Sequence, residues 1–361
     1  MPNHPAHQTQ QPRNRRNCTG WLHSYLSDRS HFISLHNHTS ATATVTQGVP
    51  QGSVLGPLLF IIYLLPLGQL LRHFSMDFHC YANDTQIYLS TKSPHNPPLS
   101  HIESCLSSLT LWMQNNFLKL NSNKTELLLI GSKSTLSKLA NPPTLTIDGT
   151  TVSPSPQARN LGVIFDSTLS LEPHIRHTVK TSFYHLHNIA KIRSSLTSHA
   201  AERLIHAFIS SRLDYCNSLL AGISTTSINR LQLVQNAAAR PLTHTKVWHH
   251  ITPVLKNLHW LPISHRIHYK LLVLTYKALH HMAPPYLSDL LSLYQPPRAL
   301  RSSSAGLLST HTSKLHSLGD RAFSRISPRL WNSLPQHIRD SESLTIFQSR
   351  LKTHLFSFAY P

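Results

Sequence analysis

The spacing of apolar residues changes near Ser170, and this change limits the possible folds more than any other feature of the sequence. After it, apolar residues recur every three to four positions, which is typical of amphipathic helices. The first helix of this kind carries Ile175, Val179, Leu186, Ile189 and Ala190. Before it, short apolar segments alternate with turn signals such as Asp148-Gly149, which is typical of β-hairpins. We therefore expect an α+β fold that is mostly helical in its C-terminal half.

The same patterns predict individual elements. Further helices are expected at about residues 200–220, 227–239 and 267–282, ended by Gly222, Pro241 and Pro284, and a last helix carries Leu344, Phe347, Leu351 and Leu355. In the N-terminal half, residues 124–130 are expected to form a strand. A helix before them has one apolar face, which we assign to the core: Ile102, Cys105, Leu106, Leu109, Trp112, Met113 and Phe117.

The chain is strongly basic although few of its residues are charged. It has 33 Lys and Arg against 14 Asp and Glu, which gives a formal net charge of +19 over 361 residues. This excess favours a polyanionic partner, RNA or DNA, because each neutralised phosphate releases condensed counterions. A basic protein without a specific partner stays the alternative.

Cysteine usage and apolar segments indicate the compartment. The four cysteines are widely separated and lack the spacing of metal ligands, and no signal peptide precedes them. We expect an intracellular protein, cytoplasmic or nuclear. Residues 54–71 are apolar enough to resemble a membrane span, but Pro57 and Pro66 interrupt helical hydrogen bonding. A buried helix is the favoured interpretation, and no contact with a membrane is expected.

Two neighbouring segments of the N-terminal half carry the candidate site. Apolar residues 74–80 and 85–89 flank Tyr81-Ala82-Asn83-Asp84, so these four residues are predicted to form a tight hairpin turn that presents short polar side chains. The preceding segment, residues 47–60, is rich in glycine and proline. Its glycines allow another backbone or a base to approach closely: Gly48, Gly52 and Gly56.

Together these segments resemble the reverse transcriptases of non-LTR (LINE-type) retrotransposons, in which the turn reads Tyr-Ala-Asp-Asp. The resemblance continues in order through residues 116–126, 161–166, 211–217, 231–240 and 259–262, and covers roughly everything from Trp21 onward. It implies an incomplete polymerase palm of β-hairpins with packed helices, followed by a helical thumb and a C-terminal helical region. The corresponding division is a disordered tail (1–20), a palm fragment (21–168), a thumb-like region (169–296), a Ser-rich linker (297–313) and a C-terminal helical segment (314–361).

The resemblance also implies a site for two Mg²⁺ ions, held by two aspartates. The family carries the first aspartate on a strand expected before Trp21 and the second at the position of Asn83, so both acids are expected to be missing. Asn83 offers a carbonyl oxygen without a charge. Asp84 matches the second acid of the turn and is the remaining candidate metal ligand, because Mg²⁺ prefers carboxylate oxygen.

Other family positions are retained. By resemblance, four residues border the incoming nucleotide, the template base and the primer end: Gln51, Gly52, Tyr81 and Ala82. Lys119 or Lys124 would approach the leaving pyrophosphate. A row along the first thumb helix would grip a phosphate backbone: Arg176, Lys180, Tyr184, His187 and Lys191. The alternatives stay open, namely a simple turn at Gly52, a core aromatic at Tyr81 and a solvated surface at the basic residues.

By lineage, the expected activity is RNA-templated DNA synthesis with Mg²⁺ and deoxynucleotides. Because a single carboxylate is a poor two-metal site, we expect this chain to be catalytically impaired. One alternative is a non-catalytic protein that binds nucleic acid through its basic row. The other is a retrotransposon remnant without a selected function. No pattern in the sequence predicts an oligomeric state.

Overall fold

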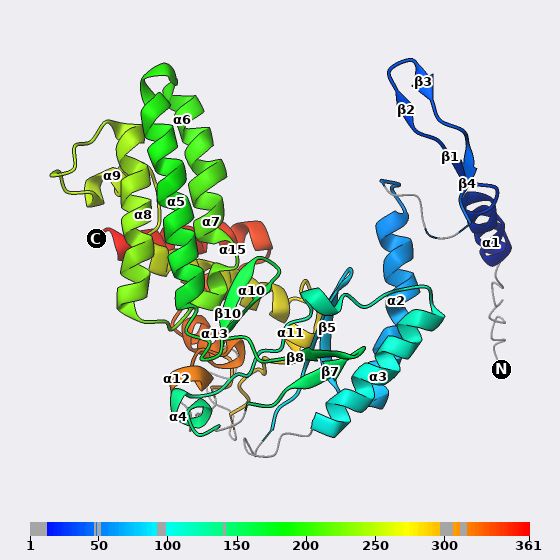
Figure 1. Ribbon diagram of the computed structural model, residues 1–361. Helices are drawn as coiled ribbons and strands as arrows, with labels where there is room; N and C mark the ends of the chain where they lie inside the picture. Colours follow the sequence, from blue (N-terminus) through cyan, green and yellow to red (C-terminus); the bar gives the residue numbers. More distant parts are fainter. Residues whose placement is uncertain are drawn as a thin grey trace, which may run out of the picture. The chain divides into compact units, whose positions relative to one another are not determined.

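The computed structural model describes residues 13–46, 48, 52–91, 99–139, 142–296, 306–310 and 316–361, drawn as a ribbon in Figure 1. The chain forms two compact units. The first comprises Met1–Thr125 and Leu145–Thr151, and the second comprises Glu126–Thr144 and Val152–Pro361. Helices and small two-stranded hairpins make up both units, which confirms the predicted α+β class. The division into palm, thumb and C-terminal region stays a prediction.

The first unit begins with elements that bury little. α1 (Arg13–Leu26) starts inside the segment predicted to be a disordered tail. Two short antiparallel pairs follow: β1 (Ser30–His31) with β4 (Ala43–Thr44), and β2 (Ser34–Leu35) with β3 (His38–Thr39). All residues of these strands are exposed, and the neighbouring Ile33 is 72% exposed.

A small core holds the rest of the first unit together. It lies between α2 (Gly56–His73), α3 (Leu99–Asn115) and the hairpin of β5 (Asp77–Tyr81) and β6 (Asp84–Tyr88). Its buried residues are Leu67, Leu71, Met76, Cys105 and Leu109. Trp112 and Met113 pack against it, as predicted. Phe117 does not, because α3 ends at Asn115 and leaves its ring 80% exposed.

One helix among the described residues, α2, has the length and composition that a membrane span requires. Pro57 lies in its first turn and Pro66 in its interior. The prediction of a buried helix is wrong for the N-terminal part of α2. Its residues that pack into the core begin at Leu67, whereas Leu58, Ile61, Ile62 and Leu65 are exposed.

Two more hairpins follow α3. β7 (Leu145–Ile147) and β8 (Thr150–Val152) enclose Asp148 and Gly149, whose positive φ angles of 48° and 73° suit the predicted turn. β9 (Gln157–Asn160) pairs antiparallel with β10 (Val163–Asp166). The strand predicted at residues 124–130 is absent there. That segment follows the 3₁₀ turn η1 (Ser122–Lys124) and makes one bridge, between Leu127 and Pro154, before α4 (Lys133–Leu136).

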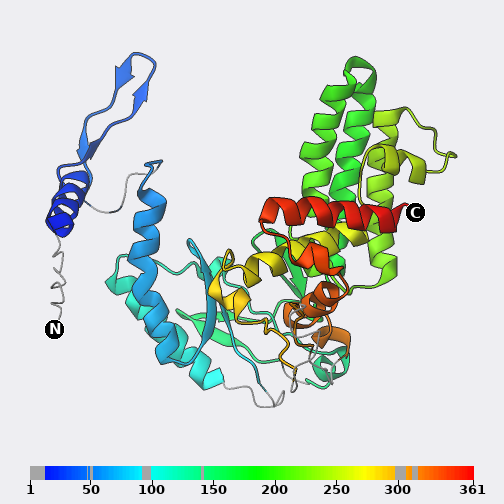
Figure 2. The ribbon, with the colours of Figure 1, turned by 180° about the vertical axis from the view of Figure 1, so that it is seen from behind.

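The second unit is mainly helical (Figures 1 and 2). After α4, its helical elements in chain order are α5 (Glu172–Ile192), η2 (Arg193–Ser195), α6 (Ser198–Ile205), the π-helical η3 (His206–Ser210), α7 (Ser211–Asp214), η4 (Asn217–Leu220), α8 (Thr225–Thr243), α9 (Thr252–Asn257), α10 (Ile263–Leu279), α11 (Pro285–Ser288), α12 (His316–Gly319), α13 (Phe323–Asn332), α14 (Gln336–Arg339) and α15 (Leu344–Ala359). α5, α6 and α8 lie side by side, and α15 crosses them and packs on α10 (Figure 2).

The predicted helices are present, with two corrections. The helix predicted at residues 200–220 is broken, because Cys216 adopts a left-handed backbone with φ of 50° and separates α7 from η4. α8 does not stop before Pro241 but continues to Thr243. A proline removes one backbone donor and crowds the preceding turn, and here the helix ends within one turn of it.

Two adjoining cores stabilise this unit. The first lies among α5, α6, α8 and the start of α10, and includes Ile175, Ile205 and Val234. The second lies among α10, α13 and α15 and is built on aromatic rings, with Tyr276 and Phe347 stacked at 4.4 Å between ring centroids. Residues 306–310, inside the predicted linker, contribute Leu308 to this second core. Residues 297–305 and 311–313 of that linker lie outside the described residues.

The carboxylate of Asp166 organises the connection from β10 to α5. One of its oxygens accepts hydrogen bonds from Thr168 Oγ1 at 2.6 Å, Thr168 N at 3.2 Å and Ser170 N at 3.1 Å, and the other accepts from Leu171 N at 2.7 Å. Arg321 closes the same turn by donating to Leu169 O at 2.7 Å. Burial alone raises the pKa of Asp166, but these hydrogen bonds outweigh it and hold the pKa below its ordinary value.

We expect Asp166→Asn to destabilise the second unit by about 2–3 kcal/mol at pH 7, because an amide cannot accept all of these charge-assisted hydrogen bonds. Since folding lowers the pKa of Asp166, its stabilising effect is complete above the unfolded pKa and is lost as pH falls through the folded one. Urea unfolding at pH 7 and pH 3 measures the free energy of unfolding of both proteins. The difference between wild type and variant should be smaller at pH 3. Asp289→Asn, at an exposed carboxylate, is the control and should change little at either pH.

Candidate functional site

The turn Tyr81-Ala82-Asn83-Asp84 joins β5 to β6 as predicted. The register pairs Tyr81 with Asp84, His79 with Gln86 and Asp77 with Tyr88. Directly opposed residues of antiparallel strands share a face, so these six side chains lie on one side of the hairpin. All six are exposed. The other side carries Phe78 and Ile87, which pack against the small core. The core thus anchors the hairpin and leaves its polar face open.

The turn itself contains a backbone outlier. Ala82 has φ of 52°, in the left-handed region that an L-residue occupies at a cost of about 1–2 kcal/mol. Tyr81, beside it, is 69% exposed. Its ring therefore lies on the surface, and the alternative that Tyr81 is a core aromatic is wrong. An exposed ring and a polar turn together form a surface that a ligand can reach.

Asp84 is the sole carboxylate at this end of the hairpin. Asp77 shares its face but lies four residues along the strand from Tyr81, which corresponds to about 13 Å. Two-metal catalysis needs carboxylates that bridge ions about 4 Å apart. Within the described part of the chain, no group of three or more His, Cys, Asp or Glu side chains could hold a metal ion. The described residues therefore do not fit a two-metal site.

The remaining candidates of the first unit are spread over separate loops. Gly52 has φ of 79° and open space where a Cβ would stand, so its backbone conformation explains the glycine. Gln51 lies outside the described residues. Lys119 and Lys124 are exposed on the segment after α3, and no described contact ties either lysine to the hairpin. That segment is fixed to α2, because Tyr63 Oη donates to Asn116 O at 2.5 Å.

The basic row lies along one exposed face of α5. Arg176, Lys180, His187 and Lys191 are exposed, and Tyr184 is 65% exposed. At 100° per residue these five positions fall within an arc of about 80°. The opposite face is buried through Ile175, Leu186 and Ile189. Among the described residues the ion pairs join His206 to Glu202, Arg230 to Glu172 and Arg266 to Asp214, so no carboxylate neutralises the row there.

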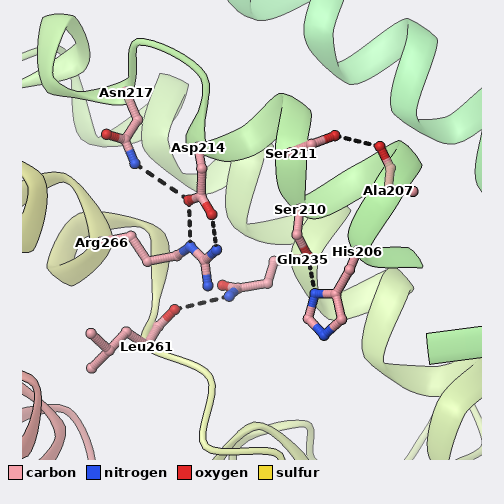
Figure 3. A network of polar contacts seen from close by, with 9 residues as sticks. All are labelled: His206, Ala207, Ser210, Ser211, Asp214, Asn217, Gln235, Leu261 and Arg266. Carbon is pink, nitrogen blue, oxygen red and sulfur yellow. Dashed lines mark hydrogen bonds and ion pairs between the residues drawn. The ribbon is translucent and has the colours of Figure 1, made fainter. Parts of the chain in front are cut away.

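Figure 3 shows polar contacts made by residues 211–217, 231–240 and 259–262, the three C-terminal motifs. Asp214, from residues 211–217, forms an ion pair with Arg266 of α10 and accepts from its Nε at 2.8 Å. Asn217 donates to the same carboxylate at 3.4 Å. The network therefore joins the end of α7 to α10, and the sequence reasoning did not identify Arg266 as the partner of this motif.

Two glutamines of α8 complete the connection. Gln235 Nε2 donates to Leu261 O at 2.9 Å, and Gln232 Oε1 accepts from Ile263 N at 2.9 Å. Leu261 O and Ile263 N both lie where residues 259–262 lead into α10. Beside them, Tyr360 Oη donates to Trp260 O at 2.6 Å, and burial raises the pKa of Tyr360 to about 12, which keeps the phenol protonated. These contacts of the motifs join α7, α8 and α10 to one another.

At its other end, α8 is tied to α5. Arg230 forms an ion pair with Glu172, and Ser227 Oγ donates to the same carboxylate at 3.0 Å. α5 is thus held at its first turn, while the side chains of its basic row are exposed. Ser227 and Arg230 of α8 therefore help to fix the position of α5, which carries the basic row.

Comparison with known proteins shows what this chain is similar to. Residues 5–165 match the reverse transcriptase (RNA-dependent DNA polymerase) family. The chain is 28% identical over 232 residues to the probable RNA-directed DNA polymerase from transposon BS of Drosophila melanogaster, and 26% identical over 229 residues to the corresponding protein from transposon X-element. It is 20% identical over 228 residues to the RNA-directed DNA polymerase from mobile element jockey of the same species.

These alignments cover 61–62% of this chain and 24–25% of each relative. The chain therefore spans about a quarter of the length of the curated relatives that it matches. No solved structure matches it.

Asn83→Asp would place two adjacent carboxylates in the turn. We expect it to increase Mg²⁺ affinity in isothermal titration, because carboxylate oxygen is the preferred ligand of this ion. We expect it not to produce primer extension on an RNA template, since the described residues supply no partner carboxylate for a second ion. Asn83→Ser is the control for the loss of the amide. Primer extension by the Asn83→Asp chain alone would contradict this expectation.

Proposed function

We propose that this chain, a reverse transcriptase domain-containing protein of the non-LTR retrotransposon type, binds an RNA template or RNA–DNA duplex along the exposed face of α5. By lineage this binding serves RNA-templated DNA synthesis. The chain by itself is catalytically impaired, and its own activity is to hold nucleic acid. In this role it corresponds to the thumb-like region and part of the palm that the sequence predicts.

The observation that carries the proposal is the basic face of α5. It combines cations at regular spacing with an exposed tyrosine, on a helix whose other side is buried. Lys and Arg neutralise phosphates, and an exposed aromatic ring contacts sugars or bases. A helix that only shields a core requires neither the sign of these charges nor their alignment. The net charge of +19 adds a long-range attraction to any polyanion.

The catalytic part of the proposal follows from the hairpin. Tyr81 and Asp84 lie on an open face, where a primer end could approach. Reverse transcriptases use divalent metal ions, which would be held by paired carboxylates and would stabilise the attacking and leaving oxygens. Asp84 alone does not provide that pair among the described residues.

Reversal of two charges on α5, Lys180→Glu with Lys191→Glu, should weaken binding to an RNA–DNA duplex. Each lost phosphate contact lowers the slope of log affinity against log salt by about 0.7–0.9, so the double variant should lose about 1.5. Fluorescence polarisation at several salt concentrations measures this slope. Lys352→Glu, at an exposed lysine of α15, is the matched control and should lose less. Binding without salt dependence would exclude the proposal and favour a remnant without selected function.

A primer-extension assay with the purified chain, Mg²⁺ and deoxynucleotides should give no product above the background of Asp84→Ala. The reason is that a single carboxylate leaves one of the two metal positions without its anionic ligand. Turnover by the chain without any added protein, abolished by Asp84→Ala, would show that the site is complete and would overturn the proposed impairment.

A further inference from the structure

The loop of residues 244–251, between α8 and α9, projects from the helical unit and presents the most exposed tryptophan of the second unit (Figures 1 and 2). Trp248 is 74% exposed, and the neighbouring Val247 is 79% exposed. The family motifs do not include this loop, and the proposed function so far does not use it. Tryptophan presents a large apolar ring with a polar N–H and is enriched at interfaces, so this exposed ring is a candidate contact for a ligand.

The loop is held in a defined conformation by arginines at its base. Arg240 of α8 donates to the carbonyl oxygens of Lys246 and His249, the latter at 3.2 Å. Arg193, just after α5, donates to Pro241 O at 2.8 Å and lies 3.0 Å from His244 Nε2. These bonds connect the loop to the end of α5 that carries Lys191. The basic face of α5 therefore leads toward the loop.

The surroundings of Trp248 are cationic. Lys246 Nζ lies 5.1 Å from the centroid of the indole ring. From Tyr215 to Ser288 the sequence contains seven Lys and Arg residues and no Asp or Glu. On α6, which packs on α8, the acid Glu202 pairs with His206. An exposed aromatic face beside a lysine, in a region without acids, is complementary to a base and its phosphate.

We propose that Trp248 is a stacking platform for an unpaired base, and that Lys246 neutralises the adjacent phosphate. This inference rests on the proposed binding of nucleic acid and specifies a second contact, for a single-stranded segment that extends beyond the duplex on α5. A base in a duplex is stacked on its neighbours and does not offer its face to a side chain, so the platform selects single strands. An apolar protein partner is less suited to it, because only Val247 and Trp248 are exposed large apolar residues in this loop, whereas Ile251 packs against the first core.

The test compares three variants of the full chain for binding to a fluorescein-labelled single-stranded oligouridylate and to an RNA–DNA duplex. We expect Trp248→Ala to weaken single-strand binding roughly tenfold, with little change for the duplex or in the salt slope, because stacking is uncharged. Trp248→Phe should retain most of the affinity. Phe358→Ala removes an aromatic ring that is 70% exposed on α15 and should change neither measurement.

Two outcomes would exclude the stacking platform. If Trp248→Ala binds the single strand as tightly as Phe358→Ala does, the platform is excluded. If Trp248→Ala instead alters self-association in sedimentation without altering oligonucleotide affinity, the loop is a protein contact and the platform is again excluded. The proposed role of α5 is tested separately, because Lys180→Glu with Lys191→Glu changes the salt slope whereas Trp248→Ala does not.

Discussion

The hydrogen-bonded carboxylate of Asp166 is the constraint on which the second unit depends. It ends a strand, closes the following turn through four donors and delivers the chain into α5. Two residues of that turn, Leu169 and Leu171, have positive φ angles of 50° and 58°, which leucine adopts only when its surroundings require it. The hydrogen bonds of the Asp166 carboxylate and of Arg321 hold the two leucines in this conformation. The direction of α5, and with it the orientation of its basic face, follows from one buried acid.

The polar residues of α8 extend this constraint to the rest of the helices. Ser227 and Arg230 fix α5, whereas Gln232 and Gln235 fix the start of α10. These contacts give residues 211–217, 231–240 and 259–262 a structural role. Their side chains join backbones that are far apart in sequence. The position of the proposed nucleic-acid surface on α5 therefore depends on internal polar contacts, and substitutions at these contacts can displace it.

Local patterns allowed the hairpin turn, the Asp-Gly turn and the positions of α5, α10 and α15 to be predicted, because capping, turn residues and apolar spacing act within a few positions. Local patterns gave wrong predictions where the structure depends on packing between residues far apart in the sequence. Residues 124–130 are apolar enough for a strand but make a single bridge, and α2 packs only where the hairpin and α3 reach it. The pairing of Asp214 with Arg266 crosses 52 positions, which no periodicity reveals. No sequence pattern identified Trp248 as a candidate binding residue, because the exposure of a side chain is a property of the folded chain.

The amide contacts of Gln232 and Gln235 have a practical consequence. Hydrogen bonds between neutral groups respond weakly to ionic strength, whereas contacts between lysines and phosphates weaken steeply as salt is added. The two kinds of interaction can therefore be separated during purification. A high-salt wash should strip cellular nucleic acid from the chain while the helices remain assembled, so that a preparation free of bound polyanion can be obtained without a refolding step.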